Sequence, residues 1–109
     1  MSRVVLIVIA FLLSVNVPAA MYKGQRVFIR KCVPCHKHRL DFIKSKTIFE
    51  WEELLEKNGK PLAQIHLKNK DAQKSWDYFK GKKYPKKLRH LREFLVGYAK
   101  DSGYVPSCN

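Results

Sequence analysis

The stretch Cys32-Val33-Pro34-Cys35-His36 places two cysteines three residues apart and a histidine directly after them. On one helical turn all three side chains fall on the same side. This spacing fits covalent haem attachment, because both thiols can add to the porphyrin vinyl groups while the imidazole reaches the iron. Two other interpretations stay open for the pentapeptide alone: a redox-active Cys-X-Pro-Cys dithiol and half of a metal site.

The first part of the chain has the pattern of a secretory signal peptide. A positive residue, Arg3, precedes the unbroken apolar run Val4 to Leu13, and small residues end the segment near Ala19. We predict cleavage after Ala19, which divides the chain into a signal peptide (1–19) and one domain (20–109). The alternative is an uncleaved anchor, since the whole apolar segment is close to the shortest length that spans a bilayer.

Export favours the haem interpretation over the dithiol, because haem is attached to cysteine pairs outside the bacterial cytoplasm. Disulfide oxidoreductases place their cysteine pair at a helix start that follows a strand in an α/β sheet. No strand pattern surrounds Cys32. We therefore expect a periplasmic protein that carries one covalent haem c on Cys32 and Cys35.

The chain is strongly basic, with 22 Lys and Arg against 9 Asp and Glu and a net charge of +13. This balance predicts an acidic partner, either a protein or a membrane surface; a solvated lysine-rich surface with no docking role is the simpler alternative. We expect no nucleic-acid partner, because the chain is exported and carries no recognisable nucleic-acid-binding motif. The densest basic segment, Lys80 to Lys87, is either a docking patch or an ordinary solvated loop.

Residues 21–31, which lead into the cysteine pair, have helical periodicity, and Val27 and Phe28 can share a broad apolar face. Gly24 leaves a flat place on this helix that suits the close approach of another helix. The spacing of glycine, aromatic residue and cysteine over Gly24 to Cys32 resembles that of class I cytochromes c. In that family the N-terminal helix crosses the C-terminal helix near the glycine and aromatic positions, so the resemblance implies a partner helix near the end of the chain.

Residues 86–100 form a second strong helix candidate, which opens after Pro85. The leucine and aromatic pattern of Leu91 to Leu95 is similar to that of the last helix in class I cytochromes c. No β-type alternation or internal repeat occurs in the sequence. We therefore expect an all-α fold, a small cytochrome c-like domain whose N- and C-terminal helices cross and whose short helices surround one haem.

Shorter helices are predicted between these two. Thr47-Ile48-Phe49-Glu50 has the spacing of a capping box and starts a helix that Asn58-Gly59 should end. Pro61 can start another short helix, and residues 71–79 form a third. Trp51 follows the capping box at helical spacing and is either a core residue or part of a haem pocket.

The second axial ligand of the iron is where this sequence departs from the family. His36 should take the proximal position, whereas class I cytochromes c usually supply a methionine to the other face from the loop before the last helix. The only methionines here, Met1 and Met21, precede the cysteine pair. We therefore predict a histidine as the distal ligand.

Two histidines are candidates for this distal position. His66 is favoured, because it lies thirty residues beyond His36 and shares a helix face with apolar residues. His90 is the second candidate, since it begins the last predicted helix and could also face inward. His38 should stay on the proximal side, close to His36. A lysine ligand or an open iron is the remaining alternative.

Two histidine ligands would suit outer-sphere electron transfer rather than catalysis. We expect a monomeric electron carrier, not an enzyme, that exchanges single electrons with acidic redox partners, among them a membrane-bound oxidase or reductase. A peroxidase-like haem enzyme or a ligand-binding protein would need an open iron, and a haem subunit of a membrane complex would keep the N-terminal anchor. Cys108 is expected to be a free thiol; a Cys108-linked dimer is the alternative.

Overall fold

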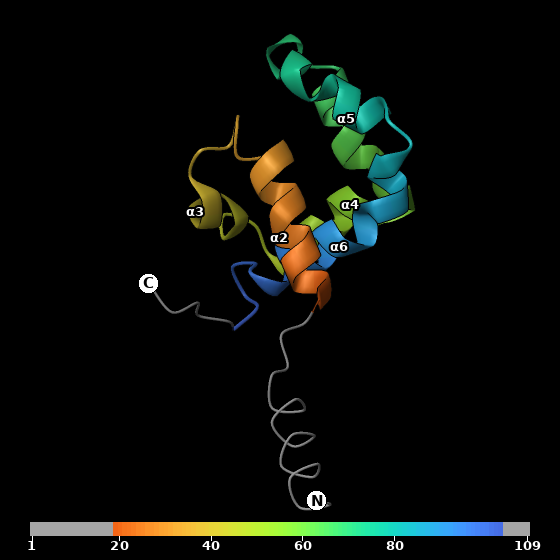
Figure 1. The fold of residues 1–109 in the computed structure, drawn as a ribbon. Coiled ribbons are helices and arrows are strands. Elements are labelled where there is room, and N and C mark those ends of the chain that lie inside the picture. The colour runs from red at the N-terminus through yellow and green to blue at the C-terminus, as the bar shows by residue number, and fades with distance from the viewer. Residues whose placement is uncertain (1–18, 104–109) are drawn as a thin grey trace, which may run out of the picture.

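The computed structural model describes residues 19–103, and every regular element within them is helical (Figure 1). The all-α prediction is therefore confirmed for this part of the chain. Residues 1–18 of the predicted signal peptide, and Cys108, lie outside the described residues. No helix between residues 19 and 103 is long and apolar enough to cross a membrane. The elements in chain order are α2 (Ala19–Lys31), α3 (Arg39–Ile43), α4 (Ile48–Leu67), the 3-10 helix η1 (Lys70–Ser75), α5 (Trp76–Lys80) and α6 (Lys83–Gly97).

Helices α2 and α6 pack directly against each other, far apart in sequence but side by side in space (Figure 1). Gly24 permits this approach, because a Cβ atom there would lie 2.7 Å from the Cβ of Phe94 and would also collide with the carbonyl of His90. Phe28, one turn further along α2, packs against the ring of Phe94 with 5.5 Å between ring centroids. The glycine and aromatic positions of α2 therefore form its contact with α6.

Helix α6 spans Lys83–Gly97 rather than residues 86–100. It begins earlier than predicted because Pro85 lies within the first turn, where a missing N–H leaves no intrahelical hydrogen bond unmade. The chain leaves the helix at Tyr98, and the N–H of Lys100 donates to the carbonyl of Lys46 at 2.9 Å. Because α6 starts at Lys83, most of the basic segment Lys80 to Lys87 is the first turn of this helix and not a loop.

The predicted capping box at the start of α4 is present. The N–H of Glu50 donates to Oγ1 of Thr47 at 3.1 Å, and the N–H of Thr47 donates to Oε1 of Glu50 at 3.0 Å. The helix that follows brings Trp51 into the core, where its side chain is 2% exposed and donates from Nε1 to the carbonyl of Ile43 at 2.9 Å. The first half of α4 is thus fixed at both its start and its inner face.

The backbone of α4 leaves the helical conformation at Glu56–Gly59, which we call the α4 break. Lys57, Asn58 and Gly59 have φ values of 51°, 60° and 76°, in the left-handed region. The carbonyl of Gly59 accepts a hydrogen bond from the hydroxyl of Tyr84 at 2.7 Å, so α6 holds the break in place. The predicted end at Asn58-Gly59 is therefore correct, and a second half of α4 continues through Pro61 to Leu67.

The predicted helix over residues 71–79 is divided between η1 and α5. The side chain of Asn69 caps η1 by accepting from the N–H of Asp71 at 2.9 Å. Trp76, the first residue of α5, donates from Nε1 to the carbonyl of His66 at 2.7 Å. This bond attaches α5 to the second half of α4 and brings the aromatic residues of α5 next to His66.

Candidate functional site

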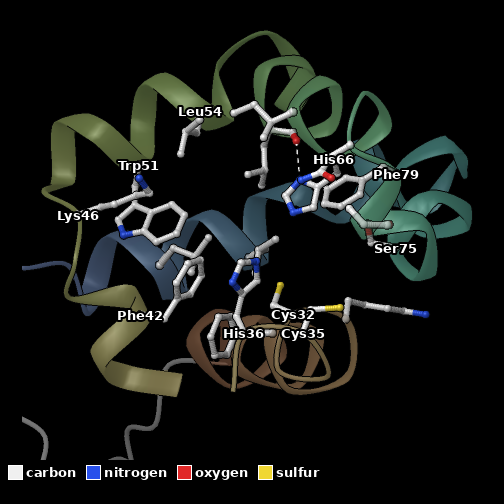
Figure 2. Close-up of a pocket in the computed structure, with 18 of the residues that line it drawn as sticks. Cys32, Cys35, His36, Phe42, Lys46, Trp51, Leu54, His66, Ser75 and Phe79 are labelled. Carbon is white, nitrogen blue, oxygen red and sulfur yellow. Dashed lines mark hydrogen bonds between the residues drawn. The ribbon is translucent and has the colours of Figure 1, made fainter. Parts of the chain in front are cut away.

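A cavity of about 380 Å³ lies between the end of α2, α3, both halves of α4, η1 and α5, with α6 behind it (Figure 2). Its volume falls within the range of about 300–1,000 Å³ that is typical of sites for small molecules and cofactors. The residues that line it include both cysteines of the motif and two histidines, Cys32, Cys35, His36 and His66. Its apolar walls are formed by Phe28, Phe42, Trp51, Leu54, Leu62, Ile65, Phe79, Leu91 and Leu95.

The cysteine motif forms a tight turn directly after α2. The carbonyl of Cys32 accepts from the N–H of Cys35 at 3.2 Å and from the N–H of His36 at 2.8 Å. This turn brings the three side chains of the motif to one wall of the cavity (Figure 2). Cys32 and Cys35 are both free thiols, and Cys35 is the more exposed of the two.

The environment of Cys32 does not activate its thiol. Burial first, and the neighbouring Cys35 second, raise the pKa of Cys32 to about 12. Disulfide oxidoreductases instead lower the pKa of the attacking cysteine, usually at a helix N-terminus. Cys32 follows the C-terminal end of α2, where the helix dipole disfavours a thiolate. These features do not suit a dithiol oxidoreductase.

His36 is half-buried on the same wall as the cysteines. Its ring stacks on Phe42 of α3, with 3.9 Å between ring centroids and an angle of 14° between planes. Burial, and secondly the nearby His66, hold the pKa of His36 below its ordinary value. Both effects favour the neutral imidazole, which is the form that binds metals.

His66 lies on the opposite wall, in the second half of α4. Its Nδ1 is 2.8 Å from the carbonyl oxygen of Leu62, shown by the dashed line in Figure 2. Since a carbonyl oxygen only accepts, Nδ1 must carry the proton, which leaves the lone pair of Nε2 free. The ring of Phe79 in α5 stacks on one face of the His66 ring, with 4.3 Å between the ring centroids. An imidazole held by a backbone carbonyl in this way is typical of histidines that bind metals.

The rings of His36 and His66 are separated by 6.2 Å between centroids and are inclined at 81° (Figure 2). A bond of about 2.0 Å from a metal to each imidazole nitrogen, and roughly 1.1 Å more to each ring centre, would give a similar distance between centroids. His36 and His66 are therefore the residues that would hold an iron in this cavity. The apolar walls around them suit a large flat macrocycle, so the residues present fit a haem.

The other residues considered as ligands lie elsewhere. His90 is on α6, where its carbonyl faces Gly24 of α2, and its side chain does not line the cavity. The sulfur of Met21 lies beside Gly97, at the contact between α2 and α6, since a Cβ at Gly97 would be 3.2 Å from it. His38 is exposed at the start of α3. Of the candidates for the distal position, only His66 faces His36.

Two lysines also line the cavity, Lys31 and Lys46. The ammonium group of Lys31 lies 5.7 Å from the ring centre of Tyr78, and that of Lys46 lies 5.9 Å from the ring of Trp51. Each amine is therefore held near an aromatic ring.

A metal ion bound by protein side chains alone would need several ligands close together. No group of three or more His, Cys, Asp or Glu residues in the described part of the chain is arranged in this way.

Two residues of this site were not assigned a role from the sequence. Phe42 stacks on His36 and Phe79 stacks on His66, and each comes from a different element than the histidine it contacts. Helical spacing reveals only neighbours on the same helix, so no pattern in the sequence could indicate these pairs. Trp76, which binds the carbonyl of His66, was missed for the same reason.

The chain has no match among protein-family models, curated proteins or solved structures. The interpretation of the cavity therefore rests on its own residues and geometry.

Proposed function

We propose that this protein is a small monohaem c-type cytochrome of the bacterial periplasm that carries single electrons between redox partners. Cys32 and Cys35 would hold the haem by two thioether bonds, and His36 and His66 would supply the axial nitrogens. The observation that carries the proposal is the pair of imidazoles in one cavity, with 6.2 Å between their ring centroids, beside two free thiols that line the same cavity. A bound haem c would supply a one-electron ferric–ferrous couple.

The residues of the cavity suit electron transfer better than catalysis. Two fixed imidazoles can stay bound in both oxidation states, so little rearrangement accompanies the transfer of an electron. Apolar side chains, among them Phe28, Phe79 and Leu91, line the cavity that contains the two histidines. They would keep water away from the two faces of a bound haem. His36 contributes a neutral ring because burial lowers its pKa, and this adds no charge to the site.

The packing of the ends of the described chain supports a cytochrome c-like arrangement. Helix α2 meets α6 at Gly24 and Phe28, which are the positions at which the sequence resembles class I cytochromes c. Because α2 ends beside the cavity, Cys32, the residue after the helix, lies in the cavity wall. The distal histidine in place of a methionine would distinguish this protein from the family's usual pattern.

The charge of the protein suits acidic redox partners. Cleavage after Ala19 would remove Arg3 and lower the net charge from +13 to +12, and this charge would attract an acidic protein, such as a domain of a membrane-bound oxidase or reductase, over about 8 Å at physiological ionic strength. The expected consequence is fast association that slows as salt is added. Stopped-flow reduction by the partner at several ionic strengths would measure this, and a rate independent of salt would contradict it.

The test of the haem itself uses protein exported by a host that attaches haem to cysteine pairs. The wild type should retain haem on a denaturing gel and should give the sharp reduced bands of a six-coordinate low-spin iron. Cys32→Ala/Cys35→Ala should lose the haem on the gel, whereas Ser102→Ala, remote from the cavity, should keep it. A wild type that carries no covalent haem would overturn the proposal, and a high-spin spectrum would favour the open iron of a haem enzyme.

A further inference from the structure

Helix α2 has a face that its packing does not use. Gly24 and Phe28 point toward α6, and Tyr22, Arg26 and Ile29 recur on the opposite side at helical spacing. The side chains of Tyr22 and Ile29 are 54% and 41% exposed, and they lie beside exposed cations on this side of the helix. We call Tyr22, Lys23, Arg26, Ile29 and Arg30 the outer face of α2.

The outer face combines apolar side chains with cations only. Lys23, Arg26 and Arg30 are all exposed, and no acidic residue occurs anywhere in Ala19–Lys31. The guanidinium of Arg26 lies 5.8 Å from the centre of the Tyr22 ring, so charge and ring form one continuous surface. A surface of this kind complements an anionic layer that also admits apolar groups.

The position of α2 in the chain also favours contact with such an anionic layer. Only five residues separate the apolar run Val4 to Leu13 from the start of α2 at Ala19. If that run is retained, it brings the start of α2 to a bilayer. If it is removed after Ala19, the new amino group adds a positive charge at the same end of the helix. A retained run would thus place the N-terminal part of α2 next to the bilayer, and a cleaved one would add to the positive charge of the outer face.

We propose that the outer face of α2 docks the protein on membranes that contain anionic phospholipids. The three cations would neutralise lipid phosphates, and Tyr22 and Ile29 would enter the interfacial layer, where tyrosine is favoured. We favour a lipid surface because α2 follows the apolar run Val4 to Leu13 in the chain; an acidic protein is the alternative occupant, and a wild type without preference for phosphatidylglycerol would favour it. Phe28 of α2, and Cys32 directly after the helix, line the cavity from another side, so this docking leaves the cavity uncovered.

The test measures the partition coefficient of the purified full-length protein between buffer and two kinds of vesicle, one of phosphatidylcholine alone and one that also contains phosphatidylglycerol. The ratio of the two coefficients removes the contribution of any uncharged apolar segment, because that contribution is the same in both vesicles. Arg26→Gln/Arg30→Gln should lower this ratio by about 25-fold, since each cation near an anionic surface contributes roughly fivefold. Tyr22→Ala/Ile29→Ala should instead lower both coefficients by roughly tenfold.

The matched control is Lys86→Gln/Lys87→Gln, which removes the same charge from exposed positions of α6. This variant should lower the ratio clearly less than the Arg variant, because its charges lie on α6 and not on the outer face of α2. All variants should keep the circular dichroism of the wild type, since the substituted side chains are exposed. An equal loss in the Arg and Lys variants, or a wild type without preference for phosphatidylglycerol, would overturn the proposal. Protein is quantified by stained gel, so the outcome does not depend on haem.

Discussion

The two walls of the cavity hold their histidines by different means. On one wall, His66 donates from Nδ1 to a backbone carbonyl, and its own carbonyl accepts from Trp76. On the other, the ring of His36 has no hydrogen-bond partner among the described residues and is held by stacking on Phe42 and by the turn that follows Cys32. The folded chain therefore fixes the His66 ring by a hydrogen bond, whereas on the His36 wall the proposed attachment of Cys32 and Cys35 to a haem would supply the further restraint.

Replacement of His66 gives the largest expected effect. In haem-loaded protein, His66→Ala should convert the iron from low spin to high spin, and added imidazole should restore the low-spin spectrum, because Phe79 and Leu62 still shape the vacated space. His38→Ala, at an exposed position outside the cavity, should leave the spectrum unchanged. If His66→Ala stays low spin while His90→Ala does not, the distal ligand is His90 and not His66.

The two thiols of the haem-free protein should differ in reactivity. Because burial raises the pKa of Cys32 to about 12, iodoacetamide at pH 8 should modify it at least about tenfold more slowly than the exposed Cys35. Mass spectrometry of timed digests measures the two rates separately. The same reaction in denaturant provides the control, since unfolding should make the rates similar. Equal rates in the folded protein would show that the His36 wall does not bury Cys32.

Trp76→Phe should loosen the His66 wall without removing its ligand. Loss of the hydrogen bond to the carbonyl of His66 should cost about 1 kcal/mol, or roughly 4–8 °C in the melting temperature of a domain this small. The haem-loaded variant should also show a small high-spin fraction. Tyr78→Phe, a change on the same helix that leaves the His66 contacts intact, should show no such fraction. A low-spin spectrum identical to the wild type would mean that Trp76 only stabilises the fold.

The smallest expected effect concerns the pH dependence of the haem-free protein. Burial, and then His66, lower the pKa of His36 in the folded state below its ordinary value of 6.5. As pH falls through 6.5, the unfolded chain binds a proton that the folded chain resists, so the free energy of unfolding decreases; it levels off below the folded pKa. Urea unfolding at pH 7 and pH 5 should show a larger decrease for the wild type than for His36→Gln. Equal decreases would indicate that His36 is solvated.

Local signals in the sequence predicted the local parts of the fold. The Thr47 capping box and the end at Asn58-Gly59 each depend on residues that are neighbours in the chain, and both are present. The start of α6 was misplaced because a proline in a first turn and a proline before a helix have the same sequence signature, and only the backbone distinguishes them. The all-α class follows from periodicity alone and is also correct for the described residues.

The candidate site was less accessible to such reasoning. His66 and His90 each share a helix face with apolar residues, and periodicity cannot tell which apolar face meets a cavity and which meets another helix. The α2–α6 contact decides this for His90, since its backbone lies against Gly24. For the same reason, periodicity could not indicate that Phe42 and Phe79 stack on histidines, because those histidines lie on other elements. Spacing within the motif brought Cys32, Cys35 and His36 together, while the opposite wall required the tertiary structure.

The α4 break has a consequence for how such a cavity can change. Lys57 and Asn58 occupy left-handed conformations that cost roughly 1–2 kcal/mol each for residues other than glycine. The chain accepts this cost at one joint, between the half of α4 that carries Trp51 and the half that carries His66. Insertion or deletion of a residue at this joint would rotate one half of α4 relative to the other. The residues that line the cavity would stay the same. The relative orientation of the two walls is thus set at a joint whose residues do not line the cavity.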